Sequence, residues 1–294
     1  FNEHFATFNE VDLQTKSWDI SGCYTNMPKK EIIEAMGAIL KMVKQDPNTD
    51  AIGKNEAHVG MNSPAIRAKT AKEMVNIPKQ GKGPVHWGRS NESDRITITF
   101  KQMMKVVEFS LNNAYFTLGD KIIQQVHGIP MGDPLSPAIC IGTCAYIEMK
   151  WFDNLPNEIK THTRFTRYLD DIYMIANKSK IADFESFLIN FTTSCYPSCL
   201  ELKKTNDDEY LECNTIIDGS DIKIKHWNKN LTHLESCGKQ YYFKHQKFHS
   251  YTMDHNKRGA MIGTWTRMAD HSNDDTLLRE SVQEKIMEFQ TLQY

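Results

Sequence analysis

The segment FTRYLDDIYMIA (165–176) places two adjacent aspartates, Asp170 and Asp171, in a stretch that otherwise has the composition of a buried β-strand. Aromatic and β-branched residues of this kind pack well on the pleated surface of a sheet. Burying ionised carboxylates is costly unless they are paired or bind a metal ion. The pair is therefore either the turn of a simple hairpin or part of a site, and the segment alone leaves both interpretations open.

Two other Asp-Asp pairs in the chain serve as internal controls. Asp207-Asp208 lies in the polar segment KKTNDDEY, which predicts a turn, and Asp274-Asp275 lies where acidic residues favour the start of a helix. Only the pair at 170–171 has strand-like sequence on both sides. A hairpin that turns at these two aspartates would present carboxylates at a rigid tip. Such a tip suits Mg²⁺, which takes one or two protein carboxylates and completes its shell with water and substrate phosphates.

A third carboxylate is available in a second strand-like segment. Asp19 is the lone acid of SWDISGCY (17–24). Two metal ions about 4 Å apart stabilise both the attacking and the leaving oxygen of a phosphoryl transfer, and that arrangement needs a carboxylate from outside the hairpin. Spacing alone does not separate such a site from an edge-strand acid beside an ordinary turn.

The composition is that of a soluble globular chain, with 40% apolar and 24% charged residues among 294. No apolar run reaches the length of a membrane span, and the first residues do not resemble a signal peptide. Seven cysteines without framework spacing indicate a reducing, intracellular setting. Cys140 and Cys144, and likewise Cys195 and Cys199, are interpreted as packed thiols.

Local signals predict an α+β fold, in which strands alternate with helices before a helical end. Asn26 and Pro28 predict the start of a helix that continues to about Lys44. Further predicted elements are a capping-box helix at Thr99 and Gln102, hairpins at Gly119-Asp120 and Asp218-Gly219, and helices near 256–269 and after Ser272 with Asp275. The Gly- and Pro-rich stretch from Gln45 to about Thr97 predicts an insertion with a short helix near 65–76.

The basic tail, residues 223–267, carries nine Lys and Arg against two acidic residues, together with five histidines. Its aromatic residues are Trp227, Tyr241, Tyr242, Phe243, Phe248, Tyr251 and Trp265. Positive charge interleaved with aromatic rings suits the backbone and bases of a nucleic acid, but a solvated basic face over a small core fits equally well. Four residues of the tail have a spacing that could bind zinc, although a nucleic-acid-facing mixture is the favoured interpretation: His233, Cys237, His245 and His249.

Three motifs occur together in a fixed order: SWDISGCYTNMP (17–28), HGIPMGDPLSP (127–137) and RYLDDIY (167–173). They resemble the A, B and C motifs of reverse transcriptases, and most of all those of Penelope-like retroelements, which are related to telomerase. The likeness continues through YLECNTIID (210–218) and KRGAMIGTWTRMAD (257–270).

The resemblance implies a right-hand polymerase palm, an antiparallel sheet packed on helices, with partial fingers and a helical thumb. Under this hypothesis residues 1–44 begin the palm with its first catalytic strand, and 45–98 form an insertion or fingers-like subdomain. Residues 99–222 complete the palm, and 223–294 form the primer grip and thumb.

The resemblance also implies roles for particular residues. Asp19, Asp170 and Asp171 would be catalytic and would hold two Mg²⁺ ions, with Mn²⁺ as an alternative metal. Tyr24 would be the steric gate that excludes a ribose 2′-hydroxyl. The remaining nucleotide-binding residues would be Gly128, Pro130, Met131, Gly132 and either Lys203 or Lys204. The nucleic-acid-binding residues would be Lys223, Lys225, Trp227, Lys244, Lys247, Lys257 and Arg258.

Two residues of the second motif depart from the reverse transcriptase pattern. Met131 stands where glutamine is more usual, and Asp133 stands where serine or threonine is usual. We expect Asp133 to cap the helix that follows it.

The resemblance thus predicts an RNA-directed DNA polymerase core whose partners are an RNA template, a DNA primer and deoxynucleoside triphosphates, with no membrane partner. It would be nuclear if it came from a eukaryotic retroelement. Because only eighteen residues precede Asp19, we expect the basic residues of the fingers to come from another segment of a longer polyprotein. The alternatives are an RNA-dependent RNA polymerase, which shares the palm, and a non-catalytic nucleic-acid-binding scaffold derived from a polymerase.

Overall fold

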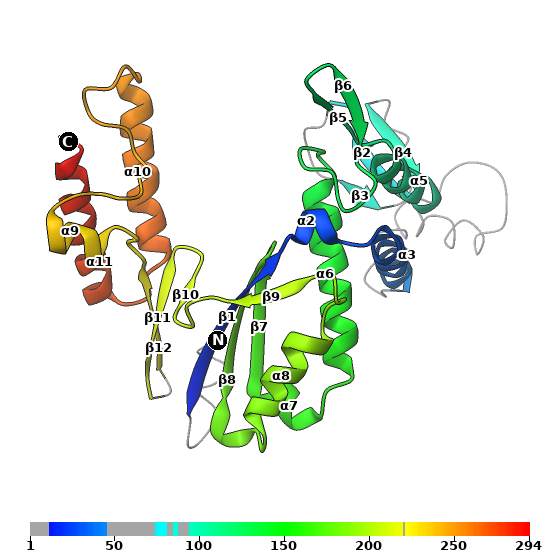
Figure 1. Ribbon diagram of the computed structural model, residues 1–294, viewed down its shortest axis with the longest axis horizontal. Coiled ribbons are helices and arrows are strands. Elements are labelled where there is room, and N and C mark those ends of the chain that lie inside the picture. The colour runs from blue at the N-terminus through cyan, green and yellow to red at the C-terminus, as the bar shows by residue number, and fades with distance from the viewer. Residues whose placement is uncertain (1–11, 46–73, 81–84, 88–93, 220) are drawn as a thin grey trace. The chain divides into compact units, whose positions relative to one another are not determined.

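The computed structural model describes residues 12–45, 74–80, 85–87, 94–219 and 221–294 (Figure 1). The chain divides into two compact units. The first unit consists of residues 1–20, 155–188 and 202–294, and the second unit consists of residues 21–154 and 189–201. Helices and antiparallel strand pairs occur in both, as the α+β prediction requires. No helix in the described ranges is both long and apolar enough to cross a membrane.

A four-stranded sheet with the order β7-β8-β1-β9 forms the centre of the first unit. Its strands are β1 (Leu13–Ser21), β7 (Thr163–Tyr168), β8 (Asp171–Asn177) and β9 (Glu201–Lys204). β8 is antiparallel to both β1 and β7. Its residues 172–177 are all buried, which explains why this strand reads as a nearly continuous apolar run.

A second sheet of the first unit has the order β10-β11-β12. Its strands are β10 (Glu209–Tyr210), β11 (Cys213–Asp218) and β12 (Asp221–His226). Pairing of Asp218 with Asp221 confirms the predicted hairpin at Asp218-Gly219. Ile222 of β12 shares a buried apolar cluster with Leu13 of β1 and Tyr173 of β8, so burial of apolar surface joins the two sheets.

The helical elements of the first unit include α11 (Asp275–Thr291), which lies where the sequence predicts a helix after Ser272. The others are α7 (Asn157–His162), η3 (Lys178–Lys180), the first residues of α8 (Phe184–Ser194), α9 (Leu231–Cys237) and α10 (Asp254–Asp270). Asp274 caps α11 by accepting hydrogen bonds from the backbone N–H groups of Thr276 and Leu277 at 2.8 and 3.1 Å. The predicted capping box at Ser272 and Asp275 is therefore wrong, because the aspartate beside the helix start makes the cap.

The second unit contains helices α2 (Cys23–Asn26), α3 (Lys29–Gln45), α5 (Phe100–Asn112) and α6 (Ser136–Asp153). Its strands are β2 (Met74–Pro78), β3 (His86–Trp87), β4 (Arg95–Thr99), β5 (Tyr115–Leu118) and β6 (Lys121–Gln124). The capping box of Thr99 and Gln102 is present at the start of α5, and the hairpin at Gly119-Asp120 joins β5 to β6. The predicted helix near 65–76 lies mostly outside the described residues, and its described end is strand rather than helix.

Candidate active site

Two of the predicted aspartates are cross-strand partners in the first unit. Asp19 near the end of β1 lies opposite Asp171, the first residue of β8, in the antiparallel register. Residues directly opposite each other in an antiparallel pair point to the same face of the sheet, with Cβ atoms about 4.5–5.5 Å apart. Both side chains are half-buried. The fold therefore brings together two carboxylates that are more than 150 positions apart in the sequence.

Asp170 lies in the turn between β7 and β8. Tyr168 pairs with Asp171, so the turn residues are Leu169 and Asp170, and the prediction of a turn at Asp170-Asp171 is wrong by one residue. Leu169 has a left-handed backbone with φ 54°, which is rare for leucine. The N–H of Ile20 donates to the carbonyl of Asp170 at 2.8 Å. This hydrogen bond fastens the turn to β1, next to the Asp19–Asp171 pair.

The electrostatics of this group favour a bound cation. Burial raises the pKa of Asp171, and the negative charges of Asp170 and Asp19 raise it further, while Lys229 opposes them. A divalent ion would relieve this repulsion, and carboxylate oxygens are the ligands that Mg²⁺ prefers. The donor set thus fits the predicted metal. In the described ranges, two groups of residues have three ligand atoms that all lie within 4.8 Å of one another, and Asp19, Asp170 and Asp171 belong to neither. The three carboxylates therefore do not form a closed ligand set.

The Asp207-Asp208 pair has a different environment, although it lies in the same unit. Asp207 forms ion pairs with Lys16 at 2.8 Å and with Lys204 at 3.2 Å. Asp208 accepts a hydrogen bond from Thr15 Oγ1 at 3.1 Å. The two lysines compensate the charge of Asp207, and the contacts from Lys16 and Thr15 hold the turn against β1. Lys204, although it pairs with Asp207, is exposed, and so is the predicted alternative, Lys203.

The second unit holds the predicted gate and its loop. Tyr24 lies in α2, and its carbonyl accepts a hydrogen bond from the N–H of Ile129 at 2.6 Å. Gly128 has φ 73°, and a Cβ at this position would lie 2.3 Å from the carbonyl oxygen of Tyr24 and 2.5 Å from that of Thr25. Only glycine allows such a close approach of two backbone segments. The loop therefore fixes the backbone that carries Tyr24.

The loop from Pro130 to Asp133 is held by hydrogen bonds at its first and last residues. Pro130 accepts a hydrogen bond at its carbonyl from the Ser136 hydroxyl. Met131 is 72% exposed, and the space beside Gly132 is open. Asp133 accepts hydrogen bonds from the Leu135 N–H at 2.8 Å and from the Ser110 hydroxyl of α5. The prediction that Asp133 caps the following helix is therefore wrong: α6 starts at Ser136 with Leu135 at its N-cap and no side-chain cap, and Asp133 stabilises the turn before it.

Several predicted nucleic-acid-binding cations of the basic tail are engaged within the protein. Lys225 pairs with Glu284 at 2.6 Å and with Glu280 at 3.1 Å, both on α11. Lys244 pairs with Glu212. Lys257 is only 7% exposed and donates to the carbonyl groups of Phe248 and Ser250. Lys247 and Arg258 are exposed, Trp227 is half-buried, and Lys223 lies 3.8 Å from Asp218.

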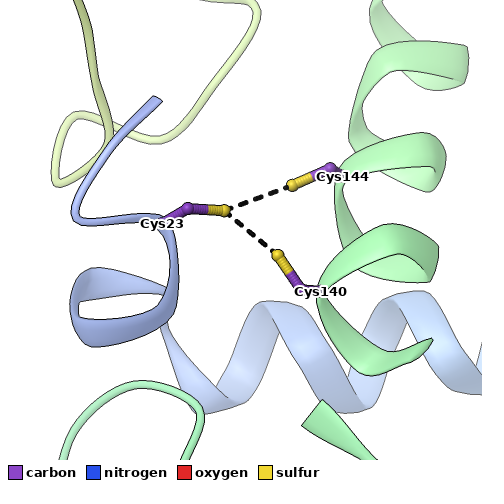
Figure 2. A group of neighbouring side chains, drawn as sticks. All are labelled: Cys23, Cys140 and Cys144. Carbon is purple, nitrogen blue, oxygen red and sulfur yellow. Dashed lines mark hydrogen bonds between the residues drawn. The ribbon is translucent and has the colours of Figure 1, made fainter. Parts of the chain in front are cut away.

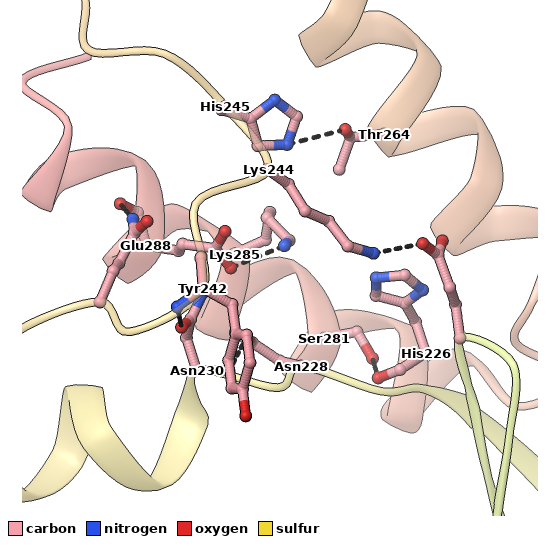
Figure 3. A network of polar contacts seen from close by, with 12 residues as sticks. His226, Asn228, Asn230, Tyr242, Lys244, His245, Thr264, Ser281, Lys285 and Glu288 are labelled. Atoms are coloured by element: carbon pink, nitrogen blue, oxygen red, sulfur yellow. Dashed lines mark hydrogen bonds and ion pairs between the residues drawn. The ribbon is translucent and has the colours of Figure 1, made fainter. Parts of the chain in front are cut away.

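A polar network holds the segment between α9 and α10 against α11, because Gln240 Nε2 of this segment donates to the carbonyl of Glu288 on α11 at 2.6 Å (Figure 3). Asn230 donates to the carbonyl of Tyr242 at 2.8 Å and accepts from the N–H of the same residue at 2.8 Å. Lys285 and Glu288 form a buried ion pair at 2.7 Å. The segment still exposes large aromatic side chains: Tyr241 is 69% exposed, Phe243 is 68% exposed and Tyr251 is fully exposed. Exposed rings beside lysines are suited to stacking with the bases of a single strand.

The four tail residues considered for zinc do not gather into one group in the described structure. Cys237 donates to the carbonyl of His233, and His245 lies 3.3 Å from Thr264 Oγ1. A different group does converge, made of Glu212, His226 and His271. The two histidines contact each other through their Nδ1 atoms at 3.4 Å. Burial and the nearby Lys285 lower the pKa of His226 to about 4, so its buried ring is uncharged at neutral pH. The contact between the two histidines joins the end of β12 to the end of α10.

The sequence matches no protein-family model and no curated protein. Among solved structures, the chain is similar to telomerase from Candida tropicalis in complex with the TWJ fragment of telomeric RNA, with a TM-score of 0.50 and 10% identity over 99% of this chain and 40% of that one. It is also similar to apo telomerase from Candida tropicalis, with a TM-score of 0.48 and 13% identity over 76% of this chain and 34% of that one. Telomerase from Candida albicans, in complex with the same kind of RNA fragment, gives a TM-score of 0.47 and 13% identity over 77% of this chain and 33% of that one.

The chain spans about two-fifths or less of the length of the telomerases that it matches. At this level of identity the likeness concerns the fold alone, a mixture of helices and antiparallel sheets similar to that of the telomerase structure. It leaves the roles of individual residues to chemical argument.

Proposed function

We propose that this chain is the core of an RNA-directed DNA polymerase, which adds deoxynucleotides to the 3′-hydroxyl of a primer. The observation that carries the proposal is the position of the three aspartates. Asp19 and Asp171 are cross-strand partners, and the Asp170 turn is hydrogen-bonded to β1 beside them. Three carboxylates at one end of a rigid sheet, one with a raised pKa, suit a site for divalent cations.

In this proposal Asp19 and Asp170 hold two Mg²⁺ ions, and Asp171 is the third carboxylate beside them. Bound metal would neutralise charge on the attacking and leaving oxygens. The protein would contribute by positioning, because β1 and the β7–β8 turn fix the carboxylates before substrate binds.

Tyr24 is proposed as the gate that selects deoxynucleotides. Its backbone is held by the Ile129 N–H and by close contact with Gly128, so its position is well defined. A tyrosine ring carried by a backbone that is held in this way can exclude a 2′-hydroxyl by steric overlap. Met131 and Gly132 are exposed in the same loop and are proposed to face the nucleotide.

We further propose, from the motif DISGCYTNMP (19–28), that the natural relatives are Penelope-like retroelement enzymes. The proposed partners are an RNA template, a DNA primer and deoxynucleoside triphosphates, and a eukaryotic host would place the enzyme in the nucleus. Telomerase in complex with telomeric RNA is among the similar folds, which is compatible with an RNA partner for this chain.

The test is primer extension on an RNA template with Mg²⁺, run in parallel with deoxynucleotides and with ribonucleotides. We expect extension with deoxynucleotides only. Extension with ribonucleotides alone would replace the proposal with an RNA polymerase. Tight binding of an RNA–DNA duplex without any extension would replace it with a binding scaffold.

A further inference from the structure

Three cysteine side chains converge inside the second unit (Figure 2). The Sγ atom of Cys23 lies 3.2 Å from that of Cys140 and 3.8 Å from that of Cys144. All three Sγ atoms lie within 4.8 Å of one another, and the three residues are at most 3% exposed. No disulfide joins them. The group is therefore a reduced, all-sulfur cluster shielded from solvent.

Two structural elements supply this cluster. Cys140 and Cys144 lie four residues apart on α6, so their side chains are neighbours on one face of the helix. Cys23 is the first residue of α2 and points between them. A pair of ligands at this helical spacing, closed by a third from a separate segment, is an arrangement suited to metal binding.

We propose that Cys23, Cys140 and Cys144 form a binding site for a thiophilic metal ion, either Zn²⁺ or Cu⁺. Thiolate ligands select these soft or borderline ions. Zinc–sulfur bonds of about 2.3 Å in a tetrahedron place the sulfurs about 3.8 Å apart, which is the distance between Cys23 and Cys144. Cys23 and Cys140 would need to separate by roughly half an ångström to fit the same geometry.

Binding balances as an exchange of protons for metal. Each of the three thiols releases one proton to solvent as its sulfur bonds to the ion, so a Zn²⁺ complex carries one net negative charge. The cluster contains no fourth Cys, His, Asp or Glu ligand from the described residues. The site thus offers three sulfurs, which suits three-coordinate Cu⁺ directly and Zn²⁺ with one external ligand.

The competing interpretation is a group of packed core thiols linked by weak S–H contacts. Packing alone does not require three sulfurs to meet. Buried thiols elsewhere in the unit, such as Cys195, are not part of the cluster. A bound ion would fasten α2 to α6, and α2 carries Tyr24. Any effect on nucleotide selection rests on the proposed function, whereas metal binding does not.

The test uses the full chain, purified under reducing conditions and stripped of metal with a chelator. Co²⁺ serves as the spectroscopic probe for the Zn²⁺ site, because bound thiolates give it a sulfur-to-cobalt charge-transfer absorption. We expect this absorption to saturate at one equivalent and to vanish when Zn²⁺ is added. A second arm supplies Cu⁺ and measures its affinity by competition with a Cu⁺ chelator. Binding in either arm at one ion per chain supports the site and identifies the class of ion.

The variants Cys23→Ser, Cys140→Ser and Cys144→Ser should each lower the metal affinity by about 100-fold or more, since each removes a direct ligand. The exposed cysteines provide matched controls, and Cys199→Ser and Cys237→Ser should leave the affinity unchanged. Circular dichroism checks that each variant is folded. The proposal is overturned if the folded wild-type chain binds neither ion, or if the control variants lose binding as the cluster variants do.

Discussion

Gly128→Ala tests whether the loop at 127–132 fixes the backbone of Tyr24. The added Cβ would lie 2.3 Å from the Tyr24 carbonyl oxygen and 2.5 Å from the Thr25 carbonyl oxygen, both main-chain atoms that cannot rotate away. The left-handed backbone at φ 73° adds about 1–2 kcal/mol for a residue with a side chain. Overpacking of this kind costs about 1–3 kcal/mol more. We therefore expect the free energy of unfolding to fall by about 2–5 kcal/mol.

Gly119→Ala is the matched control, because Gly119 also has a left-handed backbone, with φ 62°, but a Cβ there meets no atom within 4 Å. It should cost only the backbone term of about 1–2 kcal/mol. Urea denaturation of both variants, followed by circular dichroism, measures the difference. If Gly128→Ala loses no more stability than Gly119→Ala, the close backbone approach is not a constraint and the loop does not fix Tyr24.

Three further predictions concern the gate, the buried ion pair of α11 and the cap of α11. Tyr24→Ala should admit ribonucleotides in primer extension, and unchanged discrimination would remove the gate assignment. Glu288→Gln leaves the buried charge of Lys285 without its partner and should lower the free energy of unfolding, measured in urea, by about 3–5 kcal/mol. The control Glu280→Gln, in a half-exposed ion pair, should lower it by less than about 1 kcal/mol. Equal losses in the two variants would contradict the role of the buried pair. Asp274→Ala should lower the thermal midpoint by removing the α11 cap. Hydrogen bonds from the backbone N–H groups of Leu277 and Thr276 hold the pKa of Asp274 below its ordinary value of 3.8. The stabilisation by the charged cap is therefore present above pH 3.8 and disappears as the pH falls below that value. A difference in thermal midpoint between the wild type and Asp274→Ala that stays constant into strong acid would exclude the charged cap.

Local signals in the sequence predicted local structure well. The capping box of Thr99 and Gln102 and the hairpin at Gly119-Asp120 need only neighbouring residues, and both are present. The helix after Pro28 also forms as its apolar spacing predicts. The sequence does not locate the cap of α11, because Ser272 and Asp274 are both good capping residues and only the path of the chain selects between them.

Features that depend on long-range contacts could not be predicted in detail. The turn at Leu169-Asp170 uses a left-handed leucine, which no local rule anticipates, and it is fixed by a hydrogen bond to β1. The cysteine cluster joins residues more than 110 positions apart, so the spacing of Cys140 and Cys144 alone suggested only packing. The basic tail looked like a nucleic-acid surface, yet part of its charge pairs with acids on α11 that lie some 55 positions away.

The central claim is that Asp170 belongs to a metal-dependent polymerase site, and one measurement tests it most directly. Primer extension on an RNA template with Mg²⁺ and deoxynucleotides should be slowed by about 100-fold or more in Asp170→Asn, because the substitution removes a charge proposed to hold metal. The control Asp120→Asn, in the exposed hairpin turn of the second unit, should extend at the wild-type rate. Extension by Asp170→Asn at the rate of that control would contradict the account.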